Sequence, residues 1–143
     1  MENCIFSKIV RGETNTRIIY EDNLILAFHD INPAAKIHIL IIPRRPIKNM
    51  NSLKNTEEDI ILVKHMEEVG KKLFKDISPE GECRIGFTQP PFNTVPYLHM
   101  HIVSLPITCN YFRAVFLNPK LFLWTPEMIL EKIKKNKLEF INK

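Results

Sequence analysis

The chain has 143 residues, a length that suits one compact domain with a single hydrophobic core. Hydrophobic residues make up 45% and charged residues 25%, and 20 Lys and Arg against 16 Asp and Glu leave a net charge of +4. This composition is that of an ordinary soluble globular protein. The small positive charge favours anionic ligands such as nucleotides, but it is no evidence for a nucleic-acid partner.

The chain carries three cysteines, Cys4, Cys83 and Cys109, an odd number without close spacing that does not indicate a disulfide framework. We therefore expect a reducing compartment, the cytoplasm and also the nucleus. The N-terminus shows no basic segment followed by an apolar stretch, so no secretory signal is expected. The most apolar stretch, Ile37–Ile42, is interrupted by His38 and is too short to span a bilayer.

In chain order, residues 4–10 predict one or two helical turns. Two extended runs follow, 17–21 and 24–29, and the short turn between them at Asp22-Asn23 indicates a β-hairpin. Residues 36–42 (KIHILII) predict a buried strand that ends at a proline.

In the second half, segment 56–76 predicts a helix whose apolar residues recur near helical spacing: Ile60, Val63, Val69, Leu73 and Phe74. Strands are predicted over 83–88 and 97–104, on either side of a proline-rich loop. A last helix is predicted after Thr125, with Pro126 in its first position. Strands that follow one another with few helices between them favour an α+β fold with a mostly antiparallel sheet.

The segment 97–103, YLHMHIV, carries the most informative pattern. Side chains alternate between the two faces of a strand, so the even positions form one apolar face that should pack on the core. His99 and His101 then project side by side from the other face, beside Tyr97. Two neighbouring imidazoles can have separate catalytic roles. One can attack a phosphorus, while the other donates a proton or stabilises negative charge on the oxygens.

His38 lies on another predicted strand and can reach the same site if the two strands pair. Two other interpretations stay open at this point. A histidine pair on a strand is often only structural, and a zinc site would need four nitrogen or sulfur ligands, of which the N-terminal stretch offers only Cys4.

Two further residues stand beside this pattern. Asp30, at the end of a predicted strand, can accept hydrogen bonds from ribose hydroxyls, or it merely starts a turn. Thr94, in the loop before the histidines, carries a hydroxyl that can reach a leaving group, or its loop is only a rigid connector.

Taken together these segments resemble the histidine-triad (HIT) family, and within it the third branch of the HIT nucleotide-binding proteins. The resemblance covers nearly the whole chain in order. It rests on CIFSKIVRGE (4–13), LAFHDINPAAKIHILIIPRR (26–45), RIGFTQPPFNTVPYLHMHIVSLP (84–106) and the tail around Trp124. It implies a HIT-like α+β fold with an antiparallel sheet of about five strands, two main helices and a sheet extended by dimerisation.

The resemblance also implies roles for particular residues. His99 matches the family's nucleophile and His101 the histidine that contacts phosphate oxygens. His38 is placed behind His99 or on the phosphate side, and Thr94 near the leaving group. Asp30 matches the residue that holds the ribose, and the nucleoside pocket is matched by Phe6, Ile9, Phe28, His29 and Ile31.

The chain departs from the family pattern at one group of positions. Some members bind zinc through two cysteines, a histidine and the first histidine of the triad. Here the corresponding residues are Cys4, Ser7, Pro46 and Tyr97, so we expect no structural zinc and no other cofactor. Tyr97 leaves the nucleophile in place, and its phenol can still form hydrogen bonds within the site.

The implied reaction is two-step nucleotidyl transfer to water through His99, with AMP–amine phosphoramidates as the substrate class. Hydrolysis of adenylated DNA ends or of dinucleoside polyphosphates, and nucleotide binding with little turnover, are the alternatives. We expect a homodimer and no membrane partner. The whole chain, 1–143, is expected to form one domain, with its tail 110–143 packed on that domain or on the dimer partner.

Overall fold

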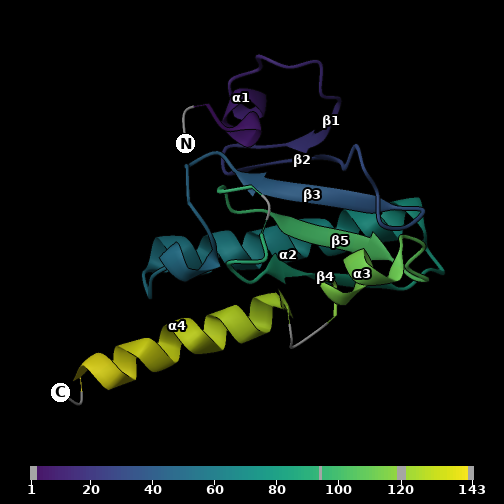
Figure 1. The fold of residues 1–143 in the computed structure, drawn as a ribbon. Coiled ribbons are helices and arrows are strands. Elements are labelled where there is room, and N and C mark those ends of the chain that lie inside the picture. The colour runs from purple at the N-terminus through teal and green to yellow at the C-terminus, as the bar shows by residue number, and fades with distance from the viewer. Residues whose placement is uncertain (1–2, 94, 119–121, 142–143) are drawn as a thin grey trace.

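Six strands form one sheet in the order β1-β2-β3-β5-β4-β6, and every neighbouring pair is antiparallel (Figure 1). The structure is a computed structural model that describes residues 3–93, 95–118 and 122–141. The strands are β1 (Ile18–Glu21), β2 (Ile25–His29), β3 (His38–Pro43), β4 (Cys83–Thr88), β5 (Met100–Ser104) and β6 (Leu123–Trp124). The helices are α1 (Ile5–Val10), the 3-10 turn η1 (Met50–Ser52), α2 (Glu57–Ile77), α3 (Tyr111–Val115) and α4 (Pro126–Ile141).

The predicted α+β fold is confirmed, and the predicted hairpin, strands and two main helices are all present. The sheet has six strands rather than about five, because the two-residue strand β6 from the tail pairs with the end of β4. The short elements η1, α3 and β6 were not predicted. The strand predicted over 97–104 begins only at Met100, because the N–H of Leu98 donates to the carbonyl of Ile47, 2.7 Å away, outside the ladder with β3.

One face of the sheet packs against α2, which runs behind it in Figure 1. Thr56 starts this helix, since its Oγ1 accepts a hydrogen bond from the backbone N–H of Asp59 at 3.2 Å. The core between helix and sheet contains the even-numbered residues Leu98, Met100 and Ile102 together with α2 side chains, as the alternation predicts. The opposite face of β5 is therefore left for His101.

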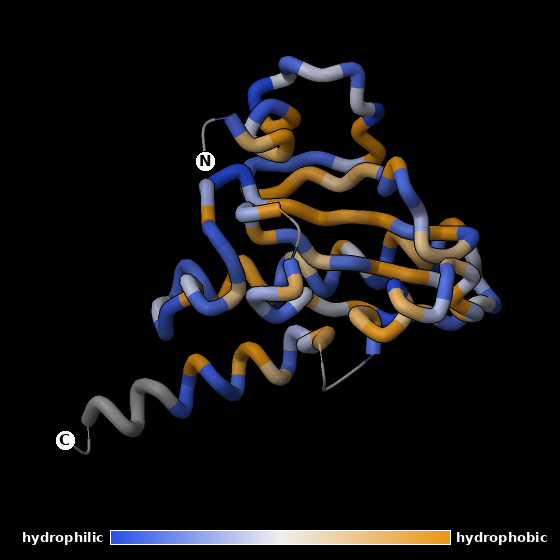
Figure 2. Tube along the Cα trace, viewed as in Figure 1, coloured by the Kyte–Doolittle hydropathy of each residue, from blue (hydrophilic) through white to orange (hydrophobic). Residues whose placement is uncertain are grey.

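The other face of the sheet carries a smaller apolar cluster under α1. It contains Phe6 and Ile9 from the helix, side chains of β2 and β3, and Tyr97. Figure 2 shows the central strands as apolar along most of their length, while α4 alternates between apolar and polar residues. Ile129 and Ile133 form the buried side of α4 against the α2 core. Within the described residues, no helix is both long and apolar enough to cross a bilayer.

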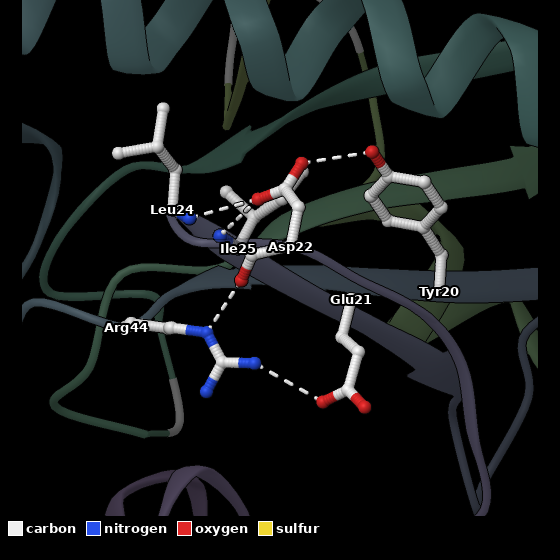
Figure 3. Close-up of polar contacts among 6 residues, drawn as sticks. All are labelled: Tyr20, Glu21, Asp22, Leu24, Ile25 and Arg44. Carbon is white, nitrogen blue, oxygen red and sulfur yellow. Dashed lines mark hydrogen bonds and ion pairs between the residues drawn. The ribbon is translucent and has the colours of Figure 1, made fainter.

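The turn between β1 and β2 is held by the carboxylate of Asp22 (Figure 3). Its Oδ1 accepts from the N–H groups of Leu24 and Ile25, at 2.8 and 3.0 Å, and its Oδ2 accepts from the hydroxyl of Tyr20 at 2.8 Å. The Nε2 of His65, on α2, lies 2.6 Å from the same Oδ2. This carboxylate thus ties the hairpin to the helix behind the sheet.

Candidate active site

A cleft of about 610 Å³ opens on the α1 side of the sheet. It lies between α1, the loop after β2, the loop after β4 and α3. The structure brings nine of the ten predicted site residues into its lining: Phe6, Ile9, Phe28, His29, Asp30, Ile31, His38, His99 and His101. The tenth, Thr94, lies outside the described residues.

The neighbouring strands β3 and β5 bring His38 and His101 together. Leu40 is paired with His101 in the register, so His38 and His101 are diagonal neighbours on the same face of the sheet. The Nε2 of His38 lies 2.9 Å from the Nδ1 of His101. The resemblance placed His38 behind His99 or on the phosphate side, and the structure places it in contact with His101.

Backbone groups decide which ring nitrogens carry hydrogen. The N–H of Ala34 donates to the Nδ1 of His38 at 3.0 Å, so a neutral His38 holds its hydrogen on Nε2. That Nε2–H must donate to the Nδ1 of His101, which leaves the hydrogen of His101 on its Nε2. His101 is therefore kept as a hydrogen-bond donor through its Nε2.

His99 is held in the opposite tautomer. Its Nδ1–H donates to the carbonyl oxygen of Tyr97 at 2.7 Å, so its Nε2 presents a lone pair. The ring of His99 lies 4.9 Å from that of His101 and 5.1 Å from that of Phe6, centroid to centroid. A backbone carbonyl therefore sets the tautomer of His99.

Burial keeps these rings neutral. It is the main cause that lowers the pKa of His38 to about 4, and it also lowers the pKa of His99 and of His101 below their ordinary value. The carboxylate of Asp30 opposes the shift in His38 and in His99. At neutral pH the site therefore holds one unprotonated nucleophilic nitrogen, on His99, beside a neutral donor, on His101.

Asp30 closes one end of the histidine group. Its Oδ2 lies 3.5 Å from the Nε2 of His38, while its Oδ1 accepts from the N–H of Asn32 at 2.9 Å. The turn role considered for Asp30 is thus present, and its role toward the ribose stays a prediction. One oxygen shapes the loop after β2, and the other faces the histidines.

Ligand atoms of Asp30, His38 and His101 all lie within 4.8 Å of one another, the spacing of a metal site. The hydrogen bonds argue for a different use. Ala34 N–H occupies the Nδ1 of His38, so the Nε2 that would face an ion carries hydrogen instead of a lone pair. These residues fit a hydrogen-bonded chain better than a cation.

Tyr97, at the position of the first histidine of the triad, points away from the cleft. Its side chain is 1% exposed, and its hydroxyl donates to the carbonyl oxygen of Pro43 at 2.6 Å. Burial raises its pKa to about 12. The phenol therefore binds the end of β3, whereas the main chain of the same residue orients His99.

Sequence reasoning missed the part of the cleft that the tail provides. Phe116 and Leu117 line the cleft together with Phe92 from the loop after β4, and the rings of Phe92 and Phe116 lie 5.6 Å apart. Arg113, on α3, lines it as well. The tail was expected only to pack on the domain or on the dimer partner. No sequence pattern in it distinguishes aromatic residues that line a cleft from those in a core.

Comparison with known proteins gives three kinds of similarity. Residues 3–113 match the family model described as "Scavenger mRNA decapping enzyme C-term binding". The bifunctional adenosine 5'-phosphosulfate phosphorylase/adenylylsulfatase HINT4 of Arabidopsis thaliana is 41% identical over 133 residues, which are 92% of this chain and 91% of that protein. The adenosine 5'-monophosphoramidase HINT3 of Danio rerio is 38% identical over 72% of this chain and 65% of that protein.

Among solved structures, a HIT family hydrolase from Clostridium thermocellum superposes with a TM-score of 0.66 and 28% identity. The match covers 85% of this chain and 99% of that one. The sequence comparison and the fold comparison therefore point to the same group of proteins.

Proposed function

The chain belongs to the histidine-triad family, and from that premise we propose that it hydrolyses purine nucleoside 5′-phosphoramidates of the AMP–amine type. At the coarser level it is a nucleotide hydrolase of the histidine-triad type. The observation that carries the finer proposal is the hydrogen bonding of the two rings, from which we infer a lone pair on His99 Nε2 beside an N–H donor on His101.

In the proposed reaction, Nε2 of His99 attacks the α-phosphorus and the P–N bond to the amine breaks. The electron pair of that bond leaves with the amine, which takes up a proton from solvent, and the water that attacks in the second step returns one. His99 is then a phosphoramidate of the nucleoside monophosphate. Water attacks the same phosphorus in the second step, the His99 nitrogen leaves with its electron pair, and nucleoside monophosphate is released.

The other residues have supporting roles in this proposal. His101 donates through Nε2 to a phosphoryl oxygen as charge builds there, and His38 holds it in that state. Asp30 accepts hydrogen bonds from the ribose, and the hydroxyl of Thr94 contacts the leaving group. Phe6, Ile9, Phe28, His29 and Ile31 enclose the nucleoside, as their place in the cleft lining allows.

The decisive experiment follows turnover of a fluorogenic AMP–amine phosphoramidate by the wild type and by His99→Asn, without added metal. We expect turnover by the wild type and its collapse in the variant. Two displacements retain the configuration at phosphorus, so net inversion with a chiral phosphate would exclude the covalent route. Binding of AMP with no turnover by either protein would instead select a nucleotide-binding role.

A second candidate reaction uses the same nucleophile with a different leaving group. The relative with adenylylsulfatase in its name matches over 92% of this chain, the greater coverage of the two relatives described above. Cleavage of a P–O bond to sulfate needs no proton on the leaving group, whereas release of an amine does. Comparing kcat/KM for adenosine 5′-phosphosulfate and for the AMP–amine in the same preparation shows which of the two reactions the protein catalyses more efficiently.

We also propose that the chain forms a homodimer through its sheet. β6 pairs with β4 only at Phe87 and Thr88, and no other described strand covers the outer edge of β4 from Cys83 to Gly86. An unpaired edge of this kind can be extended by the same strand of a second copy. Light scattering on a sizing column checks it, and a monomer at micromolar concentration would contradict it.

A reducing compartment, the cytoplasm or the nucleus, is our proposal for where the protein works. The three cysteines are free thiols and none is fully buried. Imaging of the tagged protein in its own cells provides the check.

A further inference from the structure

Arg113 gives the cleft a positive charge. Among the described residues that line the cleft, it is the one lysine or arginine. Its backbone is fixed at the start of α3, where the Oδ1 of Asn110 accepts from its N–H at 2.9 Å. Its guanidinium donates to the carbonyl oxygen of Asn32, in the loop after β2.

These contacts place Arg113 at the Asp30 end of the cleft. Asn32 is the shared anchor, because its N–H binds the carboxylate of Asp30 and its carbonyl oxygen accepts from Arg113. In sequence order His99 is followed by β5 and then by α3. Figure 1 shows α3 beside the C-terminal end of β5 and the start of β3. His99 immediately precedes β5, whereas Arg113 belongs to α3, beside the other end of that strand.

The electrostatics agree with this position. After burial, which is the main cause, the charge of Arg113 also contributes to the lowered pKa of His38 and of His101. The causes that shift the pKa of His99 are burial, the bond to Tyr97 and the charge of Asp30. The charge of Arg113 therefore acts on His38 and His101, and it is not among the causes of the shift in the pKa of His99.

The guanidinium has capacity for a ligand. An arginine has five N–H donors in a planar fork, and the bond to Asn32 uses one nitrogen, Nη2. No ion pair joins Arg113 to a carboxylate within residues 3–93, 95–118 and 122–141. A planar fork without a carboxylate partner, at the wall of a cleft, is suited to a phosphate group.

We propose that Arg113 forms a phosphate subsite at the ribose end of the cleft, so that the preferred nucleotides carry a second phosphate on the ribose. The inference rests on the proposed function, because that function directs the ribose to Asp30 and the 5′-phosphate to His99. A phosphate on one of the 2′ and 3′ oxygens lies toward Arg113 and leaves the other hydroxyl for Asp30. The ligand class is then a nucleoside bisphosphate, or a 5′-nucleotide with a phosphodiester on its ribose.

The test compares the binding of three probes, 5′-AMP, adenosine 3′,5′-bisphosphate and ADP, by titration calorimetry at fixed ionic strength. The 2′,5′-bisphosphate is titrated beside the 3′,5′ isomer, and the tighter of the two is used for the ratio. We expect the wild type to bind it at least about tenfold more tightly than 5′-AMP, as one charge-assisted contact allows. ADP, whose extra charge is on the 5′ side, should show no such gain.

The variants assign the preference to Arg113. In Arg113→Gln the ratio of the two dissociation constants should fall to near one, and Arg113→Lys should keep part of it. Lys72→Gln removes the same charge from an exposed position on α2, behind the sheet, and should leave the ratio unchanged. Near-UV circular dichroism of Arg113→Gln confirms that the tail is still packed.

Three results would overturn the inference. They are equal affinity of the wild type for 5′-AMP and both bisphosphates, a preference that survives in Arg113→Gln, and a preference for ADP that this variant abolishes. In each case 5′-AMP still binds, so the result contradicts this inference alone and leaves the proposed function to the turnover experiment. If none of the nucleotides binds, both the proposed function and this inference are wrong.

Discussion

The Nε2 of His38 lies 2.9 Å from the Nδ1 of His101, so the tautomer of His38 determines the tautomer of His101. This contact begins at the backbone of Ala34, whose N–H leaves the hydrogen of His38 on Nε2. In His38→Ala, His101 loses this constraint and can place its hydrogen on Nδ1, where it no longer serves the phosphate. We expect kcat to fall about 10- to 100-fold, less than the ~10²–10³ that follows removal of a donor to the transition state.

The conservative change His38→Gln distinguishes orientation from packing. Its side-chain amide can still donate toward the Nδ1 of His101 and should recover much of the lost kcat. Steady-state kinetics on all three proteins provide the measurement. Equal rates for His38→Ala and the wild type would show that His101 keeps its tautomer without help.

The buried neutral histidines predict how stability depends on pH. An unfolded His38 takes up a proton near pH 6.5, whereas the folded one, with its pKa at about 4, does not. The unfolded state thus binds more protons in this window, and the free energy of unfolding should fall between about pH 6.5 and 4 by up to ~1.4 kcal/mol per pH unit for each such group. His99 and His101 shift in the same direction.

Urea denaturation at pH 7.5, 6.0 and 5.0 measures this dependence. His38→Gln lacks one of the groups and should give a shallower slope, whatever its absolute stability. The depressed pKa of Asp22 acts only below its ordinary value of 3.8, outside this window. Stability that is constant from pH 7.5 to 5.0 would show that the histidines are not held neutral.

Substitution at Tyr97 should lower stability while leaving kcat nearly unchanged. Tyr97→Phe removes the hydroxyl that donates to Pro43 and leaves that carbonyl without this partner, at a cost of about 1–3 kcal/mol. The carbonyl of residue 97 still accepts from His99, so kcat should change less than about threefold. Chemical denaturation and phosphoramidate kinetics on one preparation test both. A large loss of kcat in a folded Tyr97→Phe would place the phenol in the chemistry.

Substitution at Gly86 tests whether the close packing of β6 on β4 holds the tail in place. A Cβ at this position would lie 2.7 Å from the carbonyl oxygen of Trp124 and from Cγ of Leu123, so β6 would have to move. We expect Gly86→Ala to cost about 1–3 kcal/mol and to raise KM, since Phe116 and Arg113 reach the cleft through the same tail.

Gly70→Ala is the matched control for Gly86→Ala. The three atoms nearest to its added Cβ are side-chain atoms, Cδ1 of Ile102 and Cε of Met100 at 2.9 Å and Cγ1 of Ile102 at 3.3 Å, whereas Gly86 faces backbone, and the change gains helix propensity. It should therefore cost less stability and leave KM unchanged. Equal effects of the two variants would show that the contact with Trp124 has no special part in holding the tail.

The sequence predicts best where local pattern and tertiary structure agree. The alternation in 97–103 places Met100 and Ile102 in the α2 core and His101 in the cleft, because a strand period of two holds wherever one face is buried. Thr56 predicts the start of α2 because its hydroxyl caps the helix locally. The described site residues on and next to β2, β3 and β5 gather in one cleft because these strands are neighbours in the sheet, and α1 adds Phe6 and Ile9.

The missed features depend on contacts between distant residues. β6 has two residues and exists only because it meets Phe87 and Thr88 of β4. The tautomer of His101 depends on a backbone N–H 67 positions before it, at Ala34, through a ring on another strand. Arg113 reaches the cleft because α3 folds back onto Asn32, and no periodicity in the tail encodes that return.

The cleft is walled at one side by α1, near the beginning of the chain, and at another by residues 113–117. Since a polypeptide emerges from the ribosome N-terminus first, Phe6, Asp30, His38 and His99 are all made before the segment that completes the pocket. A nascent chain released or stalled before residue 117 would carry every histidine of the site and yet lack a finished pocket. The order of synthesis itself thus delays completion of the pocket until residue 117 has been made, well after the histidines.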